Sequence, residues 1–411
     1  MGFYRTGRTG RAAPGHSAAE RTIAMQCLVL SDTFPNAVRP WRGPYNRYQV
    51  DGLAELCEVS VINPIPWTEV LKHPAYARLL RGRDDVLNNA PVYHPLLLHL
   101  PLVDRAANWK AVRRAADRCL AEGTAREVDV ILATFAYPHG LAAKTLAQEL
   151  EVPYVIKARG SDLHSLPKKG GRRRVTREAL ADAAAVVTVS DSLAELAQEL
   201  GCDPSRVTVL RNGVDAEMFR PVARRGARRA LGLNRDAEVC LFVGNLLPVK
   251  GVDVLVDAAR RLDNNAVSVA AAGTGSLSGW LHARAADPRM DVRLRPLGHL
   301  ARGEVRLWMN AADVVVLPSR DEGCPNVVLE ALACGTPVVA SRVGEVPNIL
   351  DKECGIQVEP EDAEGLADAL ETALQRDWDR RVIRGKVADM TWEDNARRLH
   401  RILRGVVRKQ A

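Results

Sequence analysis

The chain has 411 residues, of which 47% are apolar and 26% are charged. This length exceeds what one hydrophobic core usually serves, so two domains of ordinary size are expected. No apolar run approaches the roughly 20 residues that a transmembrane helix needs. Residues 1–24 are rich in Gly, Arg and Ala and lack the apolar segment of a secretory signal. We therefore expect a cytoplasmic protein with a disordered extension over residues 1–24.

The formal net charge is +7, with 57 Lys and Arg against 50 Asp and Glu. Such a balance suits nucleic acid, anionic lipid or phosphorylated small molecules as partners. No aromatic RNA-binding pattern accompanies the basic clusters Lys168–Arg177 and Arg224–Arg229, so we expect no nucleic-acid partner. Each cluster remains open to two interpretations, an anion-binding surface or simply a solvated loop and a linker.

Metal-binding patterns are weak in this sequence. Its eight cysteines are scattered without a C-x-x-C pair, which indicates reduced, mostly buried thiols rather than a zinc site. Asp377-Trp-Asp379 has the D-x-D form that metal-dependent transferases of another fold use, but it lies in a charged stretch and does not follow a strand. We interpret it as a salt-bridged segment of the protein surface, and we expect no metal site.

Short apolar runs alternate with helical patterns along the chain. They are continuous rather than alternating, which indicates strands buried on both faces of parallel sheets. In the first half the runs are Cys27–Leu30, Val59–Ile62, Val130–Thr134, Tyr154–Ile156, Val186–Val189 and Val207–Leu210. In the second half they are Cys240–Val243, Val267–Ala270, Val292–Leu294, Val314–Leu317, Val338–Ala340 and Ile356–Val358.

The series of strands pauses once, over residues 218–234, which are charged and contain Pro221 and Gly226. We place a linker there, between a first domain over residues 25–217 and a second over residues 235–390. Residues 391–411 contain a last helical pattern, a candidate crossover helix whose resting place the pattern leaves open. The predicted fold is α/β, with two Rossmann-like, doubly wound parallel-sheet domains facing a central cleft, where ligands of such sheets bind.

The most informative segment is Pro318–Pro337, which follows an expected strand. Gly323 allows a tight turn and Pro325 suits the first position of a helix. Gly335 suits the carboxyl end of that helix. The unpaired N–H groups and the dipole at the start of a helix suit a diphosphate. Glu322 in the loop is placed to reach sugar hydroxyls, and Glu330 in the helix is placed to accept from a ribose, although each alone suits a solvated or salt-bridged carboxylate equally well.

Together, the two glutamates and the Gly, Pro-Asn, Glu-Ala and Cys-Gly-Thr-Pro around them resemble the retaining glycosyltransferases of family four, which have the GT-B fold. The resemblance implies that Glu330 binds the ribose and that Glu322 holds the donor sugar. It also implies that Gly323, Cys324, Pro325, Asn326 and Val327 surround the diphosphate.

The strand–loop–helix segment Val243–Gly251 is similar to the corresponding segment of that family. The resemblance makes Lys250 a phosphate ligand, although a solvated surface lysine is the simpler interpretation of this residue alone. The family usually has Arg where this chain has Asn245, which can donate a hydrogen bond but carries no charge. One of two expected cations is therefore missing. Arg211–Asp215 resembles the turn before the linker, with Gly213 serving that turn.

In the first domain, Gly43 follows the first strand and precedes a helix predicted over Tyr48–Leu56, where the family has a loop that approaches the donor phosphate. Arg159 stands where family members often have His. It cannot act as a base, but it suits phosphate or a carboxylated sugar, and the Arg-Gly-Ser-Asp form resembles a branch that makes polysaccharides of the teichuronic-acid type. Asp162 either binds sugar hydroxyls or caps a helix. His139 also follows a strand and is a candidate near the acceptor.

These observations predict a retaining enzyme that moves a hexosyl unit from a UDP- or GDP-sugar to a glycan or lipid-linked acceptor, without a cofactor. We expect the protein in the cytoplasm, where Lys168–Arg177 contacts the inner face of the cell membrane. Two alternatives remain from the residues alone. The first is a binding protein that has lost turnover through Asn245 and Arg159, and the second is a nucleotide-sugar epimerase.

Overall fold

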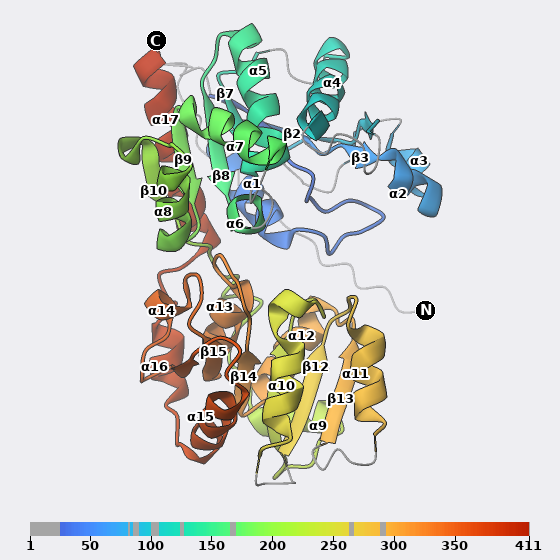
Figure 1. The fold of residues 1–411 in the computed structure, drawn as a ribbon, viewed down its shortest axis with the longest axis vertical. Helices are drawn as coiled ribbons and strands as arrows, with labels where there is room; N and C mark the ends of the chain where they lie inside the picture. Colours follow the sequence, from blue (N-terminus) through green and yellow to red (C-terminus); the bar gives the residue numbers. More distant parts are fainter. Residues whose placement is uncertain are drawn as a thin grey trace, which may run out of the picture.

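A computed structural model describes residues 25–80, 83–84, 90–99, 107–123, 127–164, 170–262, 267–287 and 293–410. Two α/β domains lie one above the other, and the carboxy-terminal helix returns from the second domain to the first (Figure 1). The extension expected over residues 1–24 lies outside the described residues.

The described part of the first domain contains an eight-stranded sheet in the order β10-β9-β8-β7-β1-β2-β5-β4. All neighbouring strands are parallel except β4, which pairs antiparallel with β5. The strands are β1 (Gln26–Leu30), β2 (Glu58–Ile62), β4 (Arg83–Asp84), β5 (Val92–Tyr93), β7 (Val130–Ala133), β8 (Tyr154–Ala158), β9 (Ala185–Thr188) and β10 (Val207–Val209). Two short strands, β3 (Ile65–Pro66) and β6 (Leu96–Leu97), pair separately.

The second domain contains a parallel sheet in the order β13-β12-β11-β14-β15-β16. Its strands are β11 (Glu238–Val243), β12 (Val267–Ala272), β13 (Arg293–Gly298), β14 (Val314–Leu317), β15 (Val338–Ser341) and β16 (Gly355–Val358). In both sheets the order changes direction beside the first strand of the domain. At such a switch point the loops diverge, and a ligand can bind beyond the carboxyl ends of the strands.

Helices connect the strands of both domains. In the first domain they are α1 (Pro44–Ala54), α2 (Trp67–Lys72), α3 (Tyr76–Leu79), α4 (Asn108–Ala121), α5 (Leu141–Leu150), α6 (Ser161–His164), α7 (Gly171–Ala181) and α8 (Asp191–Glu199). Further along the chain they are α9 (Arg224–Ala230), α10 (Val252–Ala259), α11 (Ser278–Ala285), α12 (Arg302–Ala311), α13 (Asn326–Ala333), α14 (Val346–Ile349), α15 (Ala363–Gln375), α16 (Arg380–Gly385) and α17 (Trp392–Gln410). Short turns of other helix types are η2 (Ala136–Gly140), η3 (Pro204–Arg206) and η4 (Pro248–Lys250).

Each of the twelve apolar runs corresponds to a strand, and the two-domain parallel architecture expected from them is confirmed. Strands such as β7, β14 and β15 are buried along their whole length, because helices cover both faces of each sheet. The sequence did not predict β3 to β6, which are two residues each and too short to leave a pattern. The helix expected over Tyr48–Leu56 begins four residues earlier, at Pro44, because proline suits a first turn.

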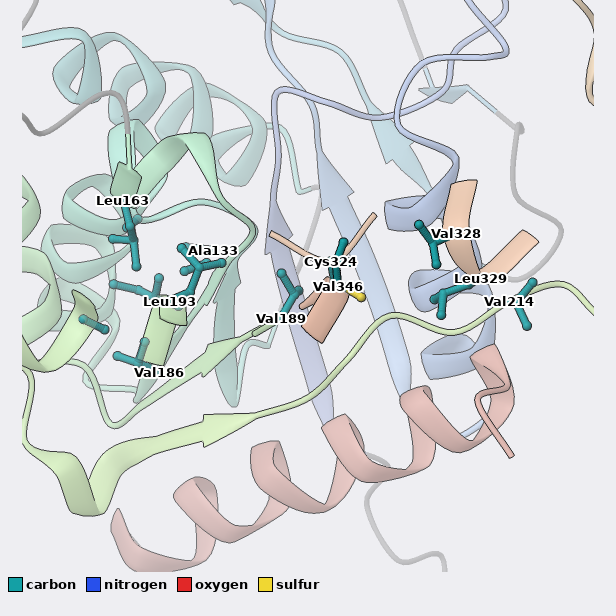
Figure 2. Packing of buried hydrophobic residues seen from close by; sticks show 14 of the residues in the cluster. Ala133, Leu163, Val186, Val189, Leu193, Val214, Cys324, Val328, Leu329 and Val346 are labelled. Carbon is teal, nitrogen blue, oxygen red and sulfur yellow. The ribbon is translucent and has the colours of Figure 1, made fainter. Parts of the chain in front are cut away.

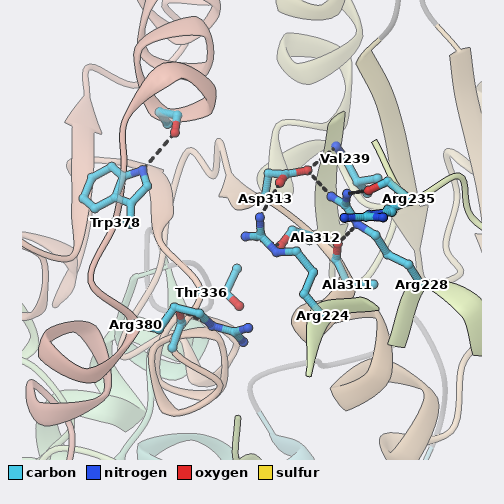
Figure 3. Close-up of polar contacts among 12 residues, drawn as sticks. Arg224, Arg228, Arg235, Val239, Ala311, Ala312, Asp313, Thr336, Trp378 and Arg380 are labelled. Atoms are coloured by element: carbon cyan, nitrogen blue, oxygen red, sulfur yellow. Dashed lines mark hydrogen bonds and ion pairs between the residues drawn. The ribbon is translucent and has the colours of Figure 1, made fainter. Parts of the chain in front are cut away.

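The basic cluster Arg224–Arg229 lies on α9, within the residues expected to link the domains. Arg224 Nη1 lies 2.8 Å from Asp313 Oδ1, and Arg228 Nη2 lies 2.6 Å from Asp313 Oδ2 (Figure 3). Asp313 directly precedes β14 and also accepts the backbone N–H of Val239 at 2.8 Å. Arg224 and Arg228 therefore attach α9 to the second sheet, so these two residues are neither free to bind an anion nor solvated side chains of a linker.

Helix α17 crosses back and packs against α1 of the first domain. Its apolar side chains Leu399, Leu403 and Val406 join the core beneath β1 and β8. The Tyr48 and Trp392 rings stack with their centroids 5.8 Å apart. The crossover helix thus rests on the first domain, a point that the sequence pattern left open.

One hydrophobic cluster extends through both domains. Val189 follows β9 in the first domain, whereas Cys324 and Val346 belong to the second, and the three lie together in Figure 2. All eight cysteines are buried free thiols. The apolar contact across the domains holds the strand ends of the two sheets close together.

Lys157 is an exception in this apolar interior. It lies on β8, is completely buried, and its Nζ has no hydrogen-bond partner among the described residues. Burial, assisted by the positive charge of Arg159, lowers the pKa of Lys157 well below its ordinary 10.5. Between that lowered pKa and 10.5 the unfolded chain binds more protons than the folded one, so this group makes stability rise with pH.

We expect Lys157→Met to stabilise the protein by about 1–3 kcal/mol at neutral pH, because it removes a buried polar group without a partner. The variant should also lose part of the rise in melting temperature between about pH 7 and 10, the range in which an unfolded lysine is still protonated. Thermal denaturation across this range measures both effects. Lys144→Met, which removes surface ion pairs with Glu178 and Asp182, is the control and should not stabilise. A Lys157→Met variant less stable than the wild type would contradict the assignment of a buried amine without a hydrogen-bond partner.

Candidate active site

A cavity of about 400 Å³ lies between the domains, at the carboxyl ends of strands from both sheets. Its first-domain wall is formed by Tyr45, Phe135, Arg159, Ser161 and Asn212. Its second-domain wall is formed by Val243, Gly244, Asn245, Lys250, Leu317, Glu322, Cys324, Pro325, Asn326 and Val327. The structure therefore brings together seven of the site residues expected in the second domain and Arg159 from the first.

The second-domain wall is built on the loop after β14 and the first turn of α13. Pro325 precedes the helix, which begins at Asn326, one residue later than the sequence analysis placed its start. The helix ends at Ala333, and Gly335 follows with a φ of 71°, as expected of the residue that closes a helix. The first N–H groups of α13 have no partner within the helix, so the positive end of its dipole lies beside the cavity.

Gly323 is a point of close contact between the two domains. A Cβ atom at this position would overlap with the carbonyl oxygen of Arg159 and would lie 3.1 Å from Val189 Cγ2. Gly323 does not line the cavity, and its role in this structure is to let the loop after β14 approach the end of β8.

Glu322 and Lys250 form an ion pair on the second-domain wall. Lys250 Nζ lies 2.6 Å from Glu322 Oε1, which also accepts the hydroxyl of Ser319 at 2.8 Å. The Lys250 side chain is 24% exposed and that of Glu322 is 9% exposed. Gly251 follows Lys250 with a φ of 64° and packs against the carbonyl of Pro318, which brings the η4 turn onto the loop after β14. Lys250 is thus a partly buried, paired residue and not a solvated lysine.

Glu330 lies behind the cavity lining, on α13. Its carboxylate Oε1 is 3.2 Å from Arg302 Nη2, and the side chain is 15% exposed. Burial raises the pKa of Glu330 to about 7, although the nearby Arg302 opposes this shift. Arg302 also lies over the rings of Phe219 and Tyr48, at 4.8 Å and 5.3 Å from their centroids. The Glu330 side chain accepts hydrogen bonds from hydroxyl groups best as a charged carboxylate, which is the main form only above its pKa.

Arg159 is held rigidly on the first-domain wall. Its Nη2 donates to Gln49 Oε1 at 3.0 Å, and its guanidinium lies 4.8 Å from the centroid of the Tyr45 ring. Its Nε and Nη1 are buried and have no partner among the described residues. Burial lowers the pKa of Arg159 to about 10, so it remains charged at neutral pH.

Three expected site residues of the first domain lie outside the lining of this cavity. Asp162 accepts backbone N–H groups from Ala136, Arg159 and Gly160 at 2.8–3.0 Å, so its carboxylate organises the loops at the ends of β7 and β8. His139 is completely buried, and burial lowers its pKa, so the imidazole is neutral. Gly43 precedes α1 with a φ of 61° and packs against the carbonyl of Thr33, as a turn glycine does.

Sequence reasoning missed several residues that form the site. Asn212 Nδ2 donates to the Cys324 carbonyl at 3.2 Å and to Asn326 Oδ1 at 2.9 Å, which joins the turn before the linker to the loop after β14. Arg211 pairs with the fully buried Glu345 and lies 2.9 Å from Asp191. The signal for Asn212 was its place in the Arg211–Asp215 motif, whereas Tyr45 and Phe135 carried no signal beyond following a strand.

A second hollow of about 320 Å³ shares Phe135 and Ser161 with the first and extends into the first domain. Its lining is mostly apolar and aromatic, with Asp32, His99 and Tyr137 as its titratable groups. Among the described residues, no group of three or more His, Cys, Asp or Glu is placed to hold a metal ion. Asp379 of the D-x-D segment instead accepts the backbone N–H groups of Arg381 and Val382 at the start of α16.

Two family descriptions match the two halves of the chain. Residues 43–213 match the glycosyl transferase 4-like domain, and residues 237–376 match the glycosyl transferases of group 1. The chain is 30% identical over 363 residues to the putative teichuronic acid biosynthesis glycosyltransferase TuaC of Bacillus subtilis, covering 84% of this chain and 88% of that protein. It is 34% identical over 283 residues to the D-inositol 3-phosphate glycosyltransferase of Frankia alni, covering 63% of this chain and 70% of that protein.

Solved structures agree on the fold. The sucrose-phosphate synthase of Thermosynechococcus elongatus matches with a TM-score of 0.75 at 20% identity, covering 93% of this chain and 99% of that one. Anabaena HepE in complex with UDP matches with a TM-score of 0.70 at 18% identity, covering 93% of this chain and 100% of that one. Two Rossmann-like domains around a cleft, with this site at the strand ends, define a GT-B protein. The chain belongs to the group 1 glycosyltransferases with a family-four-like first domain, and it is a nucleotide-sugar glycosyltransferase.

If Glu330 binds the ribose, nucleotide affinity should rise with pH through about 7, because hydroxyl donors favour the charged carboxylate and the complex then binds fewer protons. We expect Glu330→Gln to weaken binding about tenfold or more, as loss of a hydrogen bond to a charged group does, and to remove this pH dependence. Calorimetry with UDP, GDP and ADP at pH 6 and 8 measures both effects. Glu364→Gln, at an exposed position in the first turn of α15, is the control. Equal affinities in the wild type and the Glu330→Gln variant would rule out the ribose contact.

Proposed function

We propose that this enzyme is a retaining hexosyltransferase that takes its sugar from a UDP- or GDP-linked donor and transfers it to a glycan or lipid-linked acceptor in cell-surface polysaccharide biosynthesis. The observation that carries the proposal is the convergence of Lys250, Glu322 and the start of α13 on one cavity between the domains. Similarity to the teichuronic acid glycosyltransferase supports the polysaccharide role.

Electrostatic stabilisation of the leaving group is the proposed source of catalysis. The bond between the anomeric carbon and the diphosphate oxygen breaks as the bond from the acceptor oxygen forms, and negative charge accumulates on the departing nucleoside diphosphate. Lys250 and the N–H groups at the start of α13 lie where they would stabilise that charge. No metal or other cofactor enters this proposal, because the groups that act on the leaving diphosphate belong to the protein, and undiminished turnover in excess chelator would support it.

The acceptor hydroxyl attacks from the face that the diphosphate leaves, and its proton passes to the departing phosphate oxygen. This route conserves the configuration at the anomeric carbon and requires no protein base. Arg159, which stands where family members often have His, remains protonated at neutral pH and is unsuited to act as a base. Glu322 would exchange part of its contact with Lys250 for hydroxyls of the donor sugar.

The acceptor is proposed to enter through the second hollow, which joins the main cavity at Phe135 and Ser161. Its aromatic and proline-rich lining suits the apolar faces of sugar rings or the first part of a lipid chain. A screen of UDP-, GDP- and ADP-sugars by thermal shift identifies the donor, because a ligand of the folded state raises the melting temperature. The anomeric configuration of the product then tests retention, and an inverted product would refute it.

We expect Lys250→Ala to lower turnover by on the order of 10²-fold or more, because a cation at the leaving group is lost. The substitution also leaves Glu322 with Ser319 as its remaining side-chain partner, so some stability will be lost as well. Lys144→Ala is the matched control, since Lys144 is 12% exposed and ion-paired on the surface of the first domain. Turnover is measured as the initial rate of donor consumption, at a temperature below the melting temperature of each variant. A Lys250→Ala enzyme that is unstable but turns over normally when folded would show that this lysine is only structural.

The basic surface of α7 is proposed to contact anionic membrane. Arg173, Arg174 and Arg177 are exposed on α7, and they line a groove of about 620 Å³ together with Leu200 and Gly201. Lys168 and Lys169 of the same cluster lie outside the described residues. In the described part of the chain, no helix combines the length and apolar character required to span a bilayer.

At low salt we expect the protein to float with anionic vesicles but not with neutral ones. The double variant Arg173→Gln/Arg177→Gln should bind anionic vesicles about 30-fold more weakly, because each cation contributes about 1 kcal/mol near such a surface. Arg381→Gln/Arg384→Gln, which removes two exposed arginines of α16 in the second domain, is the matched control. Equal binding to both kinds of vesicle, or to neither, would instead favour a soluble acceptor.

A further inference from the structure

The second-domain wall of the cavity is poor in free positive charge. Lys250 is the lysine that lines this wall. Its Nζ lies 2.6 Å from Glu322 Oε1, and the Glu322 carboxylate offsets its positive charge. Asn245, exposed at the end of β11 on the same wall, is neutral. The dipole of α13 adds only about half an elementary charge. A departing nucleoside diphosphate carries several negative charges, which this wall alone does not balance.

The first-domain wall supplies an unused cation. The guanidinium of Arg159 has two nitrogen atoms, Nε and Nη1, that are buried and without a hydrogen-bond partner among the described residues. Buried polar groups in native proteins are almost always hydrogen-bonded, and an unpaired charged donor is among the most costly exceptions. Such a group at the wall of a ligand cavity indicates that the ligand supplies the missing acceptors.

The surroundings of Arg159 favour an anion as that ligand. Asp162 accepts backbone N–H groups with its carboxylate, as described above, and burial lowers the pKa of Lys157, two residues before Arg159, which disfavours a second positive charge there. Gln49 fixes the guanidinium from one side and is itself held by Asn395 of α17, to whose Oδ1 it donates at 2.6 Å. Asp162 offsets part of the positive charge of Arg159 through space, but the guanidinium hydrogen-bonds to Gln49 and not to a carboxylate among the described residues.

Arg159 lines the same cavity as the groups that are proposed to bind the diphosphate. Its backbone carbonyl packs against Gly323, and its side chain lines the same cavity as Asn245, Lys250 and Asn326. The loop after β14 thus brings the start of α13 to the end of β8, so that a group bound between them can contact both.

We propose that Arg159 binds the diphosphate of the donor and acts as the second cation at the leaving group, opposite Lys250. This inference rests on the proposed function and assigns the ligand of one residue within it. Its consequence is that the diphosphate site is divided between the two domains. It is complete only when the loop after β14 is packed against the end of β8, as it is in this structure.

The test compares four proteins by calorimetry: the wild type, Arg159→Gln, Asn245→Arg and the double variant. Each is titrated with UDP and uridine, and with the corresponding GDP and ADP pairs. We expect Arg159→Gln to weaken diphosphate binding by about 10- to 100-fold, as loss of a hydrogen bond to a charged group does, and to leave nucleoside binding unchanged. Asn245→Arg places a guanidinium on the opposite wall of the same cavity, so the double variant should recover at least half of the logarithmic loss in diphosphate affinity.

Arg113→Gln is the matched control, because Arg113 of α4 does not line the cavity and pairs with Asp117 of α4 and Glu149 of α5, so this variant should bind as the wild type does. Unchanged UDP, GDP and ADP affinities in Arg159→Gln would overturn the inference, and a raised KM for the acceptor would then assign Arg159 to the acceptor. Equal losses for diphosphate and nucleoside, or a loss that Asn245→Arg does not recover, would also overturn it. A wild-type protein that binds none of the three diphosphates would refute the proposed function itself.

Discussion

The close packing of the loop after β14 against the end of β8 is the contact on which the rest of the site depends. Gly323 allows it, because a side chain there would overlap with the backbone of Arg159. Val189, Cys324 and Val346 bury apolar surface around the same point. Neither domain alone encloses the cavity, since its walls come from strand ends of both sheets. The active site is thus a consequence of domain packing, and a small residue at one position sets how closely the domains approach.

Polar contacts hold the two domains in register around this point. Asn212 donates to the loop after β14, and Glu345 accepts the backbone N–H of Asp191 at 3.2 Å while it pairs with Arg211. His164 Nδ1 and Asp321 Oδ1 lie 2.5 Å apart across the cleft. Because these side chains come from the segment before the linker and from both domains, they fix the loop that carries Glu322. A charged site held in this way needs little reorganisation during the reaction, which is how preorganised dipoles lower a barrier.

The carboxy-terminal helix contributes to the site from a distance. Asn395 on α17 accepts from Gln49 at 2.6 Å and donates to the Arg211 carbonyl at 2.5 Å. Gln49 in turn accepts from Arg159. A short chain of hydrogen bonds therefore connects the last helix to one wall of the cavity and to the turn before the linker. Packing of α17 on α1 both completes the core of the first domain and orients a cation in the cleft.

The sequence by itself determined the fold class, the twelve main strands and the segment that carries Glu322 and Glu330. Buried parallel strands leave continuous apolar runs, and a helix start after a loop with Gly323 and Pro325 leaves a local pattern, so both can be recognised from the residues. The two-residue strands and the exact start of α13 were missed because a segment of one or two residues is too short to show a periodic pattern. Tertiary structure alone decided that Lys250 pairs with Glu322, that Arg224 and Arg228 hold Asp313, and that α17 rests on the first domain. It also decided that His139 is buried and that Arg159 faces the second domain. These outcomes depend on contacts between residues far apart in the chain, and the burial and pairing that set their charges exist only once the domains have packed together.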